Sequence, residues 1–241
     1  MSKLIASYRT STTGYDAANT RFVDESGLGN HLPLLAGVPD FSVSYGGKPS
    51  WSMKGDAYFG GANLLFPELF TVIMAVHPQL SAGESIKAIW SAARNYAVTD
   101  PGHATPTGVF GDTAVGSTGP YARFLSVEDT AIQVGSSYWN LRPAGYVSNA
   151  WNIVTYVWNG ETSQVKGRIG TGATGTFAID QNYQVQSIEE FRLGFRPTNI
   201  TTTAGLHMGC LRADIHVGDY TLDDPTGYAA RIAQLIADPS A

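Results

Sequence analysis

The sequence has only one cysteine and few charged residues. Cys210 is the single cysteine among 241 residues, which excludes an internal disulfide framework. It lies in a mainly apolar run, so we expect a small buried side chain rather than a reactive thiol. Charged residues make up 15% of the chain, compared with about 25% in ordinary soluble domains. A surface so poor in charge fits many short polar turns, and it also fits burial against neighbouring subunits in a homo-oligomer or larger assembly.

Long apolar runs and basic clusters are also missing. The longest apolar stretch, around Phe70–Val76, is far shorter than the ~20 residues that span a bilayer. The N-terminal residues contain no apolar segment typical of a signal peptide. The net charge of −5 gives no excess of positive charge that would attract nucleic acid or an anionic membrane. We therefore predict no nucleic-acid partner, no membrane partner, and synthesis in a reducing cytosol.

Short segments with strand-like patterns recur along the chain, separated by Gly, Pro, Asn, Asp or Ser. The strongest is Trp151–Trp158, which is rich in β-branched and aromatic residues. It is followed by Asn159-Gly160, a dipeptide typical of two-residue hairpins. The stretch 99–120, with its Pro, Gly and Thr residues, is expected to be an insertion or an extended loop. Further strands are expected at Phe41–Tyr45, Phe70–Val76, Ile86–Trp90, Ala122–Leu125, Ala131–Val134, Val165–Ile169 and Phe191–Leu193.

One segment near the C-terminus has a helical pattern instead. Asp224 can cap a helix whose first residue is Pro225, a favoured position because proline has no N–H to leave unpaired. Asp238 precedes a proline and therefore ends the helix. We expect this helix to lie over one edge or end of the packed sheets. Its predicted apolar stripe consists of Tyr228, Ile232, Leu235 and Ile236.

Three pieces, in order along the chain, resemble the concanavalin A-like lectin/glucanase superfamily, specifically the laminin-G-like jelly rolls of bacterial and phage proteins. Asp24-Glu-Ser-Gly-Leu-Gly-Asn-His-Leu32 is similar to the turn after the family's first strand. Trp151–Gly160 resembles a family hairpin, and Ala213–Leu222 resembles the last strand. The resemblance implies an all-β fold: a two-sheet antiparallel jelly-roll sandwich with one short C-terminal helix. No linker or repeat interrupts the chain, so residues 1–241 are expected to form a single domain.

The resemblance also implies a candidate structural Ca²⁺ site. Many family members hold this ion with the glycine-rich turn and an acid on the last strand, which correspond here to Asp24, Asn30 and Asp214. Ca²⁺ requires 6–8 oxygen ligands, and these three residues supply few. The alternative is an Asx-type turn in which Asp24 accepts hydrogen bonds from backbone amides. No other cofactor is predicted.

The sequence predicts no catalytic centre. Glucanases of this superfamily place their carboxylates at alternating positions of one strand, so that they share a face. Here the acid pairs Glu128-Asp129, Glu189-Glu190 and Asp223-Asp224 are adjacent and would face opposite sides. Gly170–Gly175 has glycines spaced as in a phosphate-binding loop, but a strand pattern rather than a helix follows, so a hairpin loop is expected. A polysaccharide-acting enzyme whose site is assembled from distant strands stays open as an alternative.

Aromatic residues in or beside loops are candidates for binding a surface glycan. Glycan binding needs exposed rings flanked by planar polar side chains, and Tyr96, Tyr121, Tyr138 and Trp139 are candidates because they lie in or beside loops. The alternative for Tyr138 and Trp139 is packing beneath a loop.

Two functions of different class follow. The first is a non-catalytic structural or binding module on a phage virion surface, as a capsid decoration or tail-associated protein with glycan adhesion, made in the host cytoplasm without a signal peptide. The second is a free, lectin-like carbohydrate-binding module. The first predicts stable attachment to a virion or other assembly, and the second predicts glycan binding that is lost on Trp139→Ala.

Overall fold

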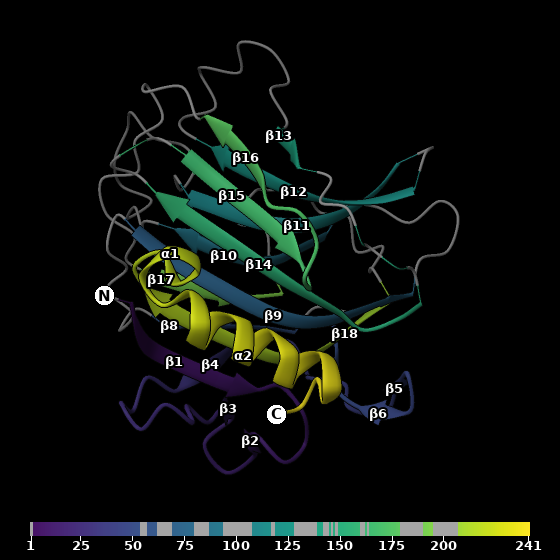
Figure 1. Cartoon of the computed structure of the whole chain (residues 1–241). Coiled ribbons are helices and arrows are strands. Elements are labelled where there is room, and N and C mark those ends of the chain that lie inside the picture. Colours follow the sequence, from purple (N-terminus) through teal and green to yellow (C-terminus); the bar gives the residue numbers. More distant parts are fainter. Residues whose placement is uncertain are drawn as a thin grey trace, which may run out of the picture.

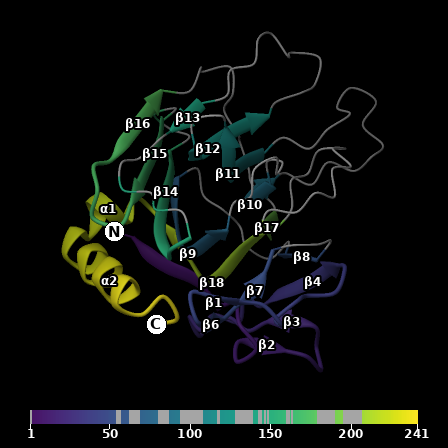
Figure 2. The same ribbon diagram turned by 90° about the vertical axis from the view of Figure 1, so that its right-hand side faces the viewer.

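Two antiparallel sheets pack face to face to form a sandwich (Figures 1 and 2). The computed structural model describes residues 2–53, 57–61, 69–79, 87–93, 108–116, 119–127, 139–141, 145, 147, 149–159, 162, 164–178, 190–194 and 207–241. This architecture confirms the predicted all-β class and its antiparallel pairing.

The first sheet has seven strands in the order β1-β18-β9-β14-β15-β16, with β7 also paired to β18. Their bounds are β1 Lys3–Arg9, β7 Trp51–Ser52, β9 Leu69–Gln79, β14 Asn152–Asn159, β15 Gln164–Ile169, β16 Gly175–Ala178 and β18 His207–Val217. The N-terminal and C-terminal strands are therefore neighbours, because β1 pairs with β18 along its whole length.

The second sheet has nine strands in the order β13-β12-β11-β10-β17-β8-β4-β3-β2. Their bounds are β2 Tyr15–Asp16, β3 Arg21–Phe22, β4 Leu32–Ala36, β8 Tyr58–Gly61, β10 Lys87–Ala93, β11 Gly108–Gly116, β12 Gly119–Val127, β13 Trp139–Leu141 and β17 Glu190–Leu193. A separate two-stranded hairpin joins β5 (Ser44–Tyr45) and β6 (Lys48–Pro49).

The core between the sheets follows from the two-residue period of a strand. Phe70, Val72, Met74 and Val76 of β9 all belong to the main buried cluster, whereas Ile73 and Ala75 belong to a second one. Both faces of β9 are thus buried, which explains its continuous apolar sequence. The main cluster also contains Ala6, Tyr8, Phe22, Leu32, Trp51, Met53, Phe59, Val154, Tyr156, Trp158, Phe191, Leu193, Cys210, Ala213 and Ile215.

Helix α2 (Pro225–Ala237) covers the outer face of the seven-stranded sheet (Figures 1 and 2). The predicted cap is confirmed, because the Asp224 carboxylate accepts a hydrogen bond from the N–H of Gly227 at 2.9 Å. The predicted position at an edge or end was wrong: Tyr228, Ile232 and Leu235 pack in the second cluster, on strands β9 and β14. The helix lies on the face of the sheet because these two strands have apolar side chains on that outer face, and the helix buries them.

Three finer predictions about the helical region and its hairpins were wrong or incomplete. Ile236 is 53% exposed rather than part of the buried stripe. A one-turn helix, α1 (Tyr220–Asp223), precedes α2. Asn159 ends β14 but pairs with Gln164, so the connection is a longer loop and not a two-residue Asn-Gly turn. The Asn159 side-chain oxygen accepts a hydrogen bond from the N–H of Thr162 at 3.0 Å, and this contact favours the longer loop.

The predicted loop at 99–120 was also wrong in part. Residues 108–116 form β11, which is paired on both sides with β10 and β12. Glycines at 108, 111 and 116 suggested a loop, yet a fully paired strand accommodates them. Phe41–Val43 lie outside any strand, whereas Ala131–Val134 lie outside the described residues. Within the described part of the chain, no helix is long and apolar enough to cross a membrane.

Candidate ligand-binding site

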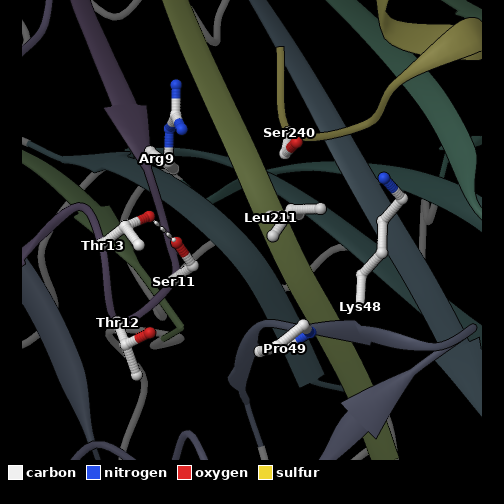
Figure 3. A pocket seen from close by; sticks show the side chains of 8 residues that line it. All are labelled: Arg9, Ser11, Thr12, Thr13, Lys48, Pro49, Leu211 and Ser240. Atoms are coloured by element: carbon white, nitrogen blue, oxygen red, sulfur yellow. Dashed lines mark hydrogen bonds between the residues drawn. The ribbon is translucent and has the colours of Figure 1, made fainter.

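A bulge in β18 shapes the outer face of the seven-stranded sheet near the end of β1. Cys210 pairs with Val76 and Arg212 pairs with Ala75, so Leu211 is an extra residue between two consecutive partners. The Leu211 carbonyl accepts a hydrogen bond from the N–H of Thr10 at 3.1 Å. A bulge of this kind re-aims the side chain of the extra residue, and Leu211 faces a surface pocket (Figure 3).

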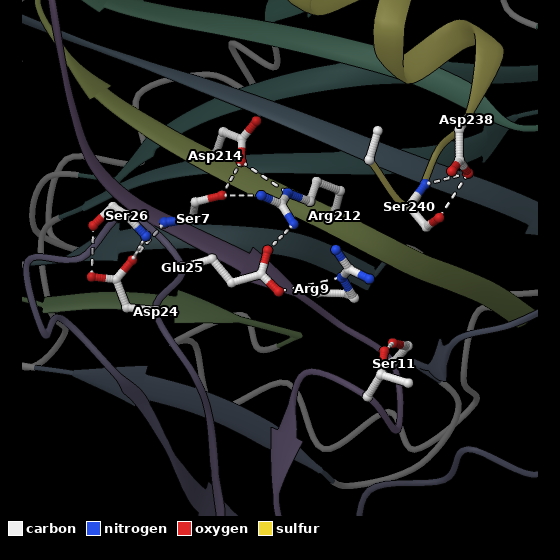
Figure 4. A network of polar contacts seen from close by, with 12 residues as sticks. Ser7, Arg9, Ser11, Asp24, Glu25, Ser26, Arg212, Asp214, Asp238 and Ser240 are labelled. Atoms are coloured by element: carbon white, nitrogen blue, oxygen red, sulfur yellow. Dashed lines mark hydrogen bonds and ion pairs between the residues drawn. The ribbon is translucent and has the colours of Figure 1, made fainter.

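Beyond the bulge, β18 contributes a buried polar network to the same outer face (Figure 4). The Arg212 guanidinium donates to Asp214 at 3.2 Å and to the hydroxyl of Ser7 at 2.5 Å. Arg231 of α2 reaches the other Asp214 oxygen at 2.6 Å. The Asp214 side chain is 2% exposed, so its charge is compensated by two guanidinium groups rather than by water.

Glu25 links this network to the end of β1. One carboxylate oxygen of Glu25 pairs with Arg212, and the other lies 3.3 Å from Nε of Arg9. The two arginines therefore share one carboxylate. Arg9 is the more exposed of the two, with 37% of its side chain accessible against 8% for Arg212, so the guanidinium nearer to solvent is the one beside the pocket.

The glycine-rich turn after residue 23 is organised by Asp24. Its carboxylate accepts hydrogen bonds from the backbone N–H groups of Ser7, Ser26 and Asn30, each at 2.9 Å. Burial opposes the charged form, but the hydrogen bonds from Ser26, Ser7 and Asn30 outweigh it and lower the pKa of Asp24. This is the Asx-type arrangement that was the alternative to a metal site.

The described contacts of Asp24, Asn30 and Asp214 do not fit a calcium centre. Asp24 and Asp214 both contact Ser7, so the fold does bring them near one another. Their oxygens, however, face amide hydrogens and guanidinium groups, and the Asn30 side-chain nitrogen donates to the carbonyl of Ile5. Among the described residues, no group of three or more His, Cys, Asp or Glu side chains could hold a metal ion.

The surface pocket beside the bulge has a volume of about 250 Å³ (Figure 3). Leu211 and Pro49 supply its apolar lining, and Arg9 and Lys48 supply two cations. The turn after β1 and the C-terminal segment add four hydroxyl groups, those of Ser11, Thr12, Thr13 and Ser240. A pocket with an apolar base and a rim of donors and acceptors is the usual form of a small-ligand site.

Hydrogen bonds hold the rim of this pocket in place. Nζ of Lys48 lies 2.7 Å from the Asp238 carboxylate, which also accepts hydrogen bonds from the N–H and the hydroxyl of Ser240. The hydrogen bond from Lys48, followed by those from Ser240, lowers the pKa of Asp238 well below its usual range. On the opposite side, the hydroxyls of Ser11 and Thr13 are 2.9 Å apart.

The structure places only part of the predicted aromatic set. Tyr121 lies on β12 opposite Ala114, and Trp139 lies on β13 opposite Phe124, at the edge of the nine-stranded sheet. Tyr96 and Tyr138 lie outside the described residues. The glycan-binding role of all four residues stays a prediction.

Sequence reasoning missed the pocket and the network beside it. The pocket collects residues from both ends of the chain and from the β5–β6 hairpin, and no sequence motif links these segments. One signal was available: Arg212 and Asp214 are separated by one residue in an otherwise apolar strand. Such spacing places two charges on one face, where a partner arginine or acid is expected.

No protein-family model and no curated protein matches this sequence. Solved structures are similar in fold. A botulinum neurotoxin type C structure, described in connection with cell entry through two ganglioside molecules, has a TM-score of 0.55 at 12% identity and covers 96% of this chain and 51% of its own. The binding domain of botulinum neurotoxin DC in complex with SialylT has a TM-score of 0.52 at 11% identity, with 96% and 51% covered.

Domain 4 of AbnA, a GH43 extracellular arabinanase from Geobacillus stearothermophilus, is similar over nearly its whole length. That structure, in complex with arabinotriose, has a TM-score of 0.54 at 15% identity and covers 90% of this chain and 93% of its own. This chain spans about half the length of the toxin chains but most of the AbnA domain. At these identities the likeness concerns the fold alone, and it confirms the β-sandwich.

Proposed function

We propose that this chain is a non-catalytic carbohydrate-binding module. The observation that carries the proposal is the pocket beside Leu211, where hydroxyl groups and two cations surround an apolar base. Its volume of about 250 Å³ lies just below the ~300 Å³ at which pockets for drug-sized molecules begin. One sugar ring, with an apolar C–H face and polar hydroxyl edges, suits both the size and the chemistry of this pocket.

The fold neighbours support the same proposal. The AbnA domain was solved with arabinotriose and the neurotoxin DC domain with SialylT. Both have a sandwich similar to this one, and the first matches it over nearly its whole length. The laminin-G-like phage type suggested by the sequence motifs is a finer assignment within this proposal.

The acids beside the pocket favour binding over hydrolysis. Glycoside hydrolysis needs a carboxylic acid with a raised pKa next to a second carboxylate. Asp238 has a lowered pKa because Lys48 and Ser240 donate hydrogen bonds to it. Glu25 is held between two arginines. Both carboxylates act as partners for cations in this arrangement.

A glycan array probed with the intact chain tests the proposal. We expect binding to a subset of saccharides, and a blank array would overturn it. Trp139→Ala, compared with a variant at the pocket, distinguishes binding through the predicted aromatic residues from binding at Leu211. Release of reducing ends from a polysaccharide panel would instead support the enzymatic alternative.

We also propose that the module is displayed on a virion or other large assembly. The charged content of 15% supports this, because surfaces that become buried against other subunits are depleted in charge. Co-purification with virions, together with light scattering of the isolated protein, provides the test. A monomer at high concentration that is absent from purified virions would overturn this second proposal.

A further inference from the structure

We propose that the pocket beside Leu211 is a subsite for an acidic sugar residue, with the sugar carboxylate bound between Arg9 and Lys48. The inference rests on the proposed carbohydrate-binding function and names the chemical class of its ligand. The two cations line one pocket of about 250 Å³ together with Leu211, Pro49 and four hydroxyl groups.

The ion pairs around Arg9 leave part of its guanidinium group able to bind a second carboxylate. Glu25 is shared by Arg9 and Arg212, so two guanidinium groups face one carboxylate. The contact with Arg9 involves Nε, at 3.3 Å. The described residues show no hydrogen bond to its two Nη groups. A guanidinium presents these groups as a planar fork that matches a carboxylate with two parallel hydrogen bonds.

Lys48 supplies the second cation from the opposite wall of the pocket (Figure 3). Its ammonium group has three donors, and the contact with Asp238 at 2.7 Å uses one of them. The Lys48 side chain is 38% exposed, close to the 37% of Arg9. Both cations can therefore be reached from solvent, and each is held by one acid, Arg9 by Glu25 and Lys48 by Asp238.

The remaining lining fits a sugar better than a simple anion. Pro49 is exposed and offers an apolar surface for the C–H face of a ring, and Leu211, 2% exposed in the bulge, backs it from below. Ser240 donates its hydroxyl hydrogen to Asp238, so its oxygen is left to accept from a sugar hydroxyl. Sulfate or phosphate would use the cations and the hydroxyl donors but not the apolar lining.

The test compares acidic and neutral saccharides by titration calorimetry at low ionic strength. The probes are 3′-sialyllactose and trigalacturonate as acids, lactose and arabinotriose as neutral sugars, and sodium sulfate. We expect at least one acid to bind about tenfold more tightly than the neutral sugars, the gain typical of a charged hydrogen bond. Arg9→Gln and Lys48→Gln should each weaken binding of the acid by about this factor, a larger loss than either variant causes for the neutral sugars.

Lys3→Gln is the matched control. Lys3 is exposed on the same strand as Arg9, six residues and ~20 Å away, and its loss changes net charge by the same amount. Thermal melts establish that each variant is folded. If Arg9→Gln does not fold, the test relies on Lys48→Gln alone. The inference is overturned if the acids still bind as tightly to Lys48→Gln and to a folded Arg9→Gln. It is also overturned if sulfate binds as tightly as the acids. Binding of neutral sugars without preference for acids overturns it and leaves the proposed function standing, whereas no binding by any sugar counts against both.

Discussion

Arg212 and Asp214 pair with each other along a single strand, with Nε and Oδ1 3.2 Å apart and both side chains almost fully buried. They lie on the same face because strand side chains repeat every second residue. Arg231 from α2 completes the pairing at 2.6 Å from the second oxygen of Asp214. The helix is thus attached to the sheet by charge at β18 as well as by apolar packing at β9 and β14.

Replacing the central acid of this network should destabilise the fold strongly. Asp214→Ala leaves two guanidinium groups without their buried partner, which typically costs about 3–5 kcal/mol. Urea unfolding measures the change in free energy of unfolding. Asp16→Ala is the control, because its pair with Arg21 is closer to the surface and its loss should cost much less. Equal losses in the two variants would contradict the assigned role of Asp214.

His216 predicts a loss of stability at mildly acidic pH. Its ring stacks on Tyr220, with centroids 4.1 Å apart. Burial lowers the pKa of His216 to about 4; nearby Asp214 raises it and Arg231 lowers it. The unfolded chain takes up a proton near pH 6.5 and the folded chain does not, so the free energy of unfolding falls as pH drops from about 6.5 to 4. The full loss is about 2–3 kcal/mol.

The His216→Phe variant isolates this effect. Phenylalanine retains the ring stacking but cannot take up a proton, so stability should fall less steeply between pH 6.5 and 4. The slope that remains is expected from His77, whose pKa is also lowered by burial. Both proteins should still lose stability below that window, because the pKa values of Asp16 and Asp24 are lowered by hydrogen bonds in the fold. Urea midpoints at several pH values provide the measurement. An unchanged slope in the variant would assign the pH dependence to other groups.

The cap of α2 predicts a smaller, specific effect. Asp224→Ala removes the acceptor for the N–H of Gly227 and should lower the free energy of unfolding by about 1 kcal/mol. Asp224→Asn retains an acceptor oxygen and should remain within a few tenths of a kcal/mol of the original chain. Thermal unfolding of both variants checks this. A loss of equal size for Asn and Ala would point to the charge rather than the hydrogen bond.

Cys210 should be inert in the folded protein. Its side chain is fully buried, and burial raises the pKa of the thiol to about 12. The thiolate is the reactive form, so Ellman's reagent at pH 8 should label the native chain only as fast as it unfolds. One thiol per chain should react at once in guanidinium chloride. Rapid labelling without denaturant would contradict the buried position.

The elements that were predicted correctly are those with local signals. Asp224-Pro225 begins α2, and the β-branched and aromatic residues of Trp151–Trp158 form β14. β11 was missed because its glycines are typical of turns, whereas its pairing on both sides comes from distant strands. The position of α2 on the sheet face was missed for a similar reason, since it depends on the outward-facing residues of β9 and β14.

Local patterns indicated single members of the candidate site, such as Asp214, but not how they come together. Ser7 and Asp214 are in hydrogen-bond contact although 207 positions separate them, and Lys48 and Asp238 are separated by 190. Their proximity results from the pairing of β1 with β18 and from the return of the C-terminal segment over that pair. A pattern search along the chain sees each of these residues as an isolated surface charge or hydroxyl.

The extra residue at Leu211 belongs to the pocket and not to the alternation that builds the core. Before it, Cys210 points into the main core; after it, Ala213 and Ile215 do, so inward positions change from even to odd numbers. Deletion of Leu211 would restore a single parity, with Cys210, Ala213 and Ile215 still facing the core and Arg212 and Asp214 still facing outward. The pocket would lose the bulge and one lining residue, so this position can vary without disturbing the core.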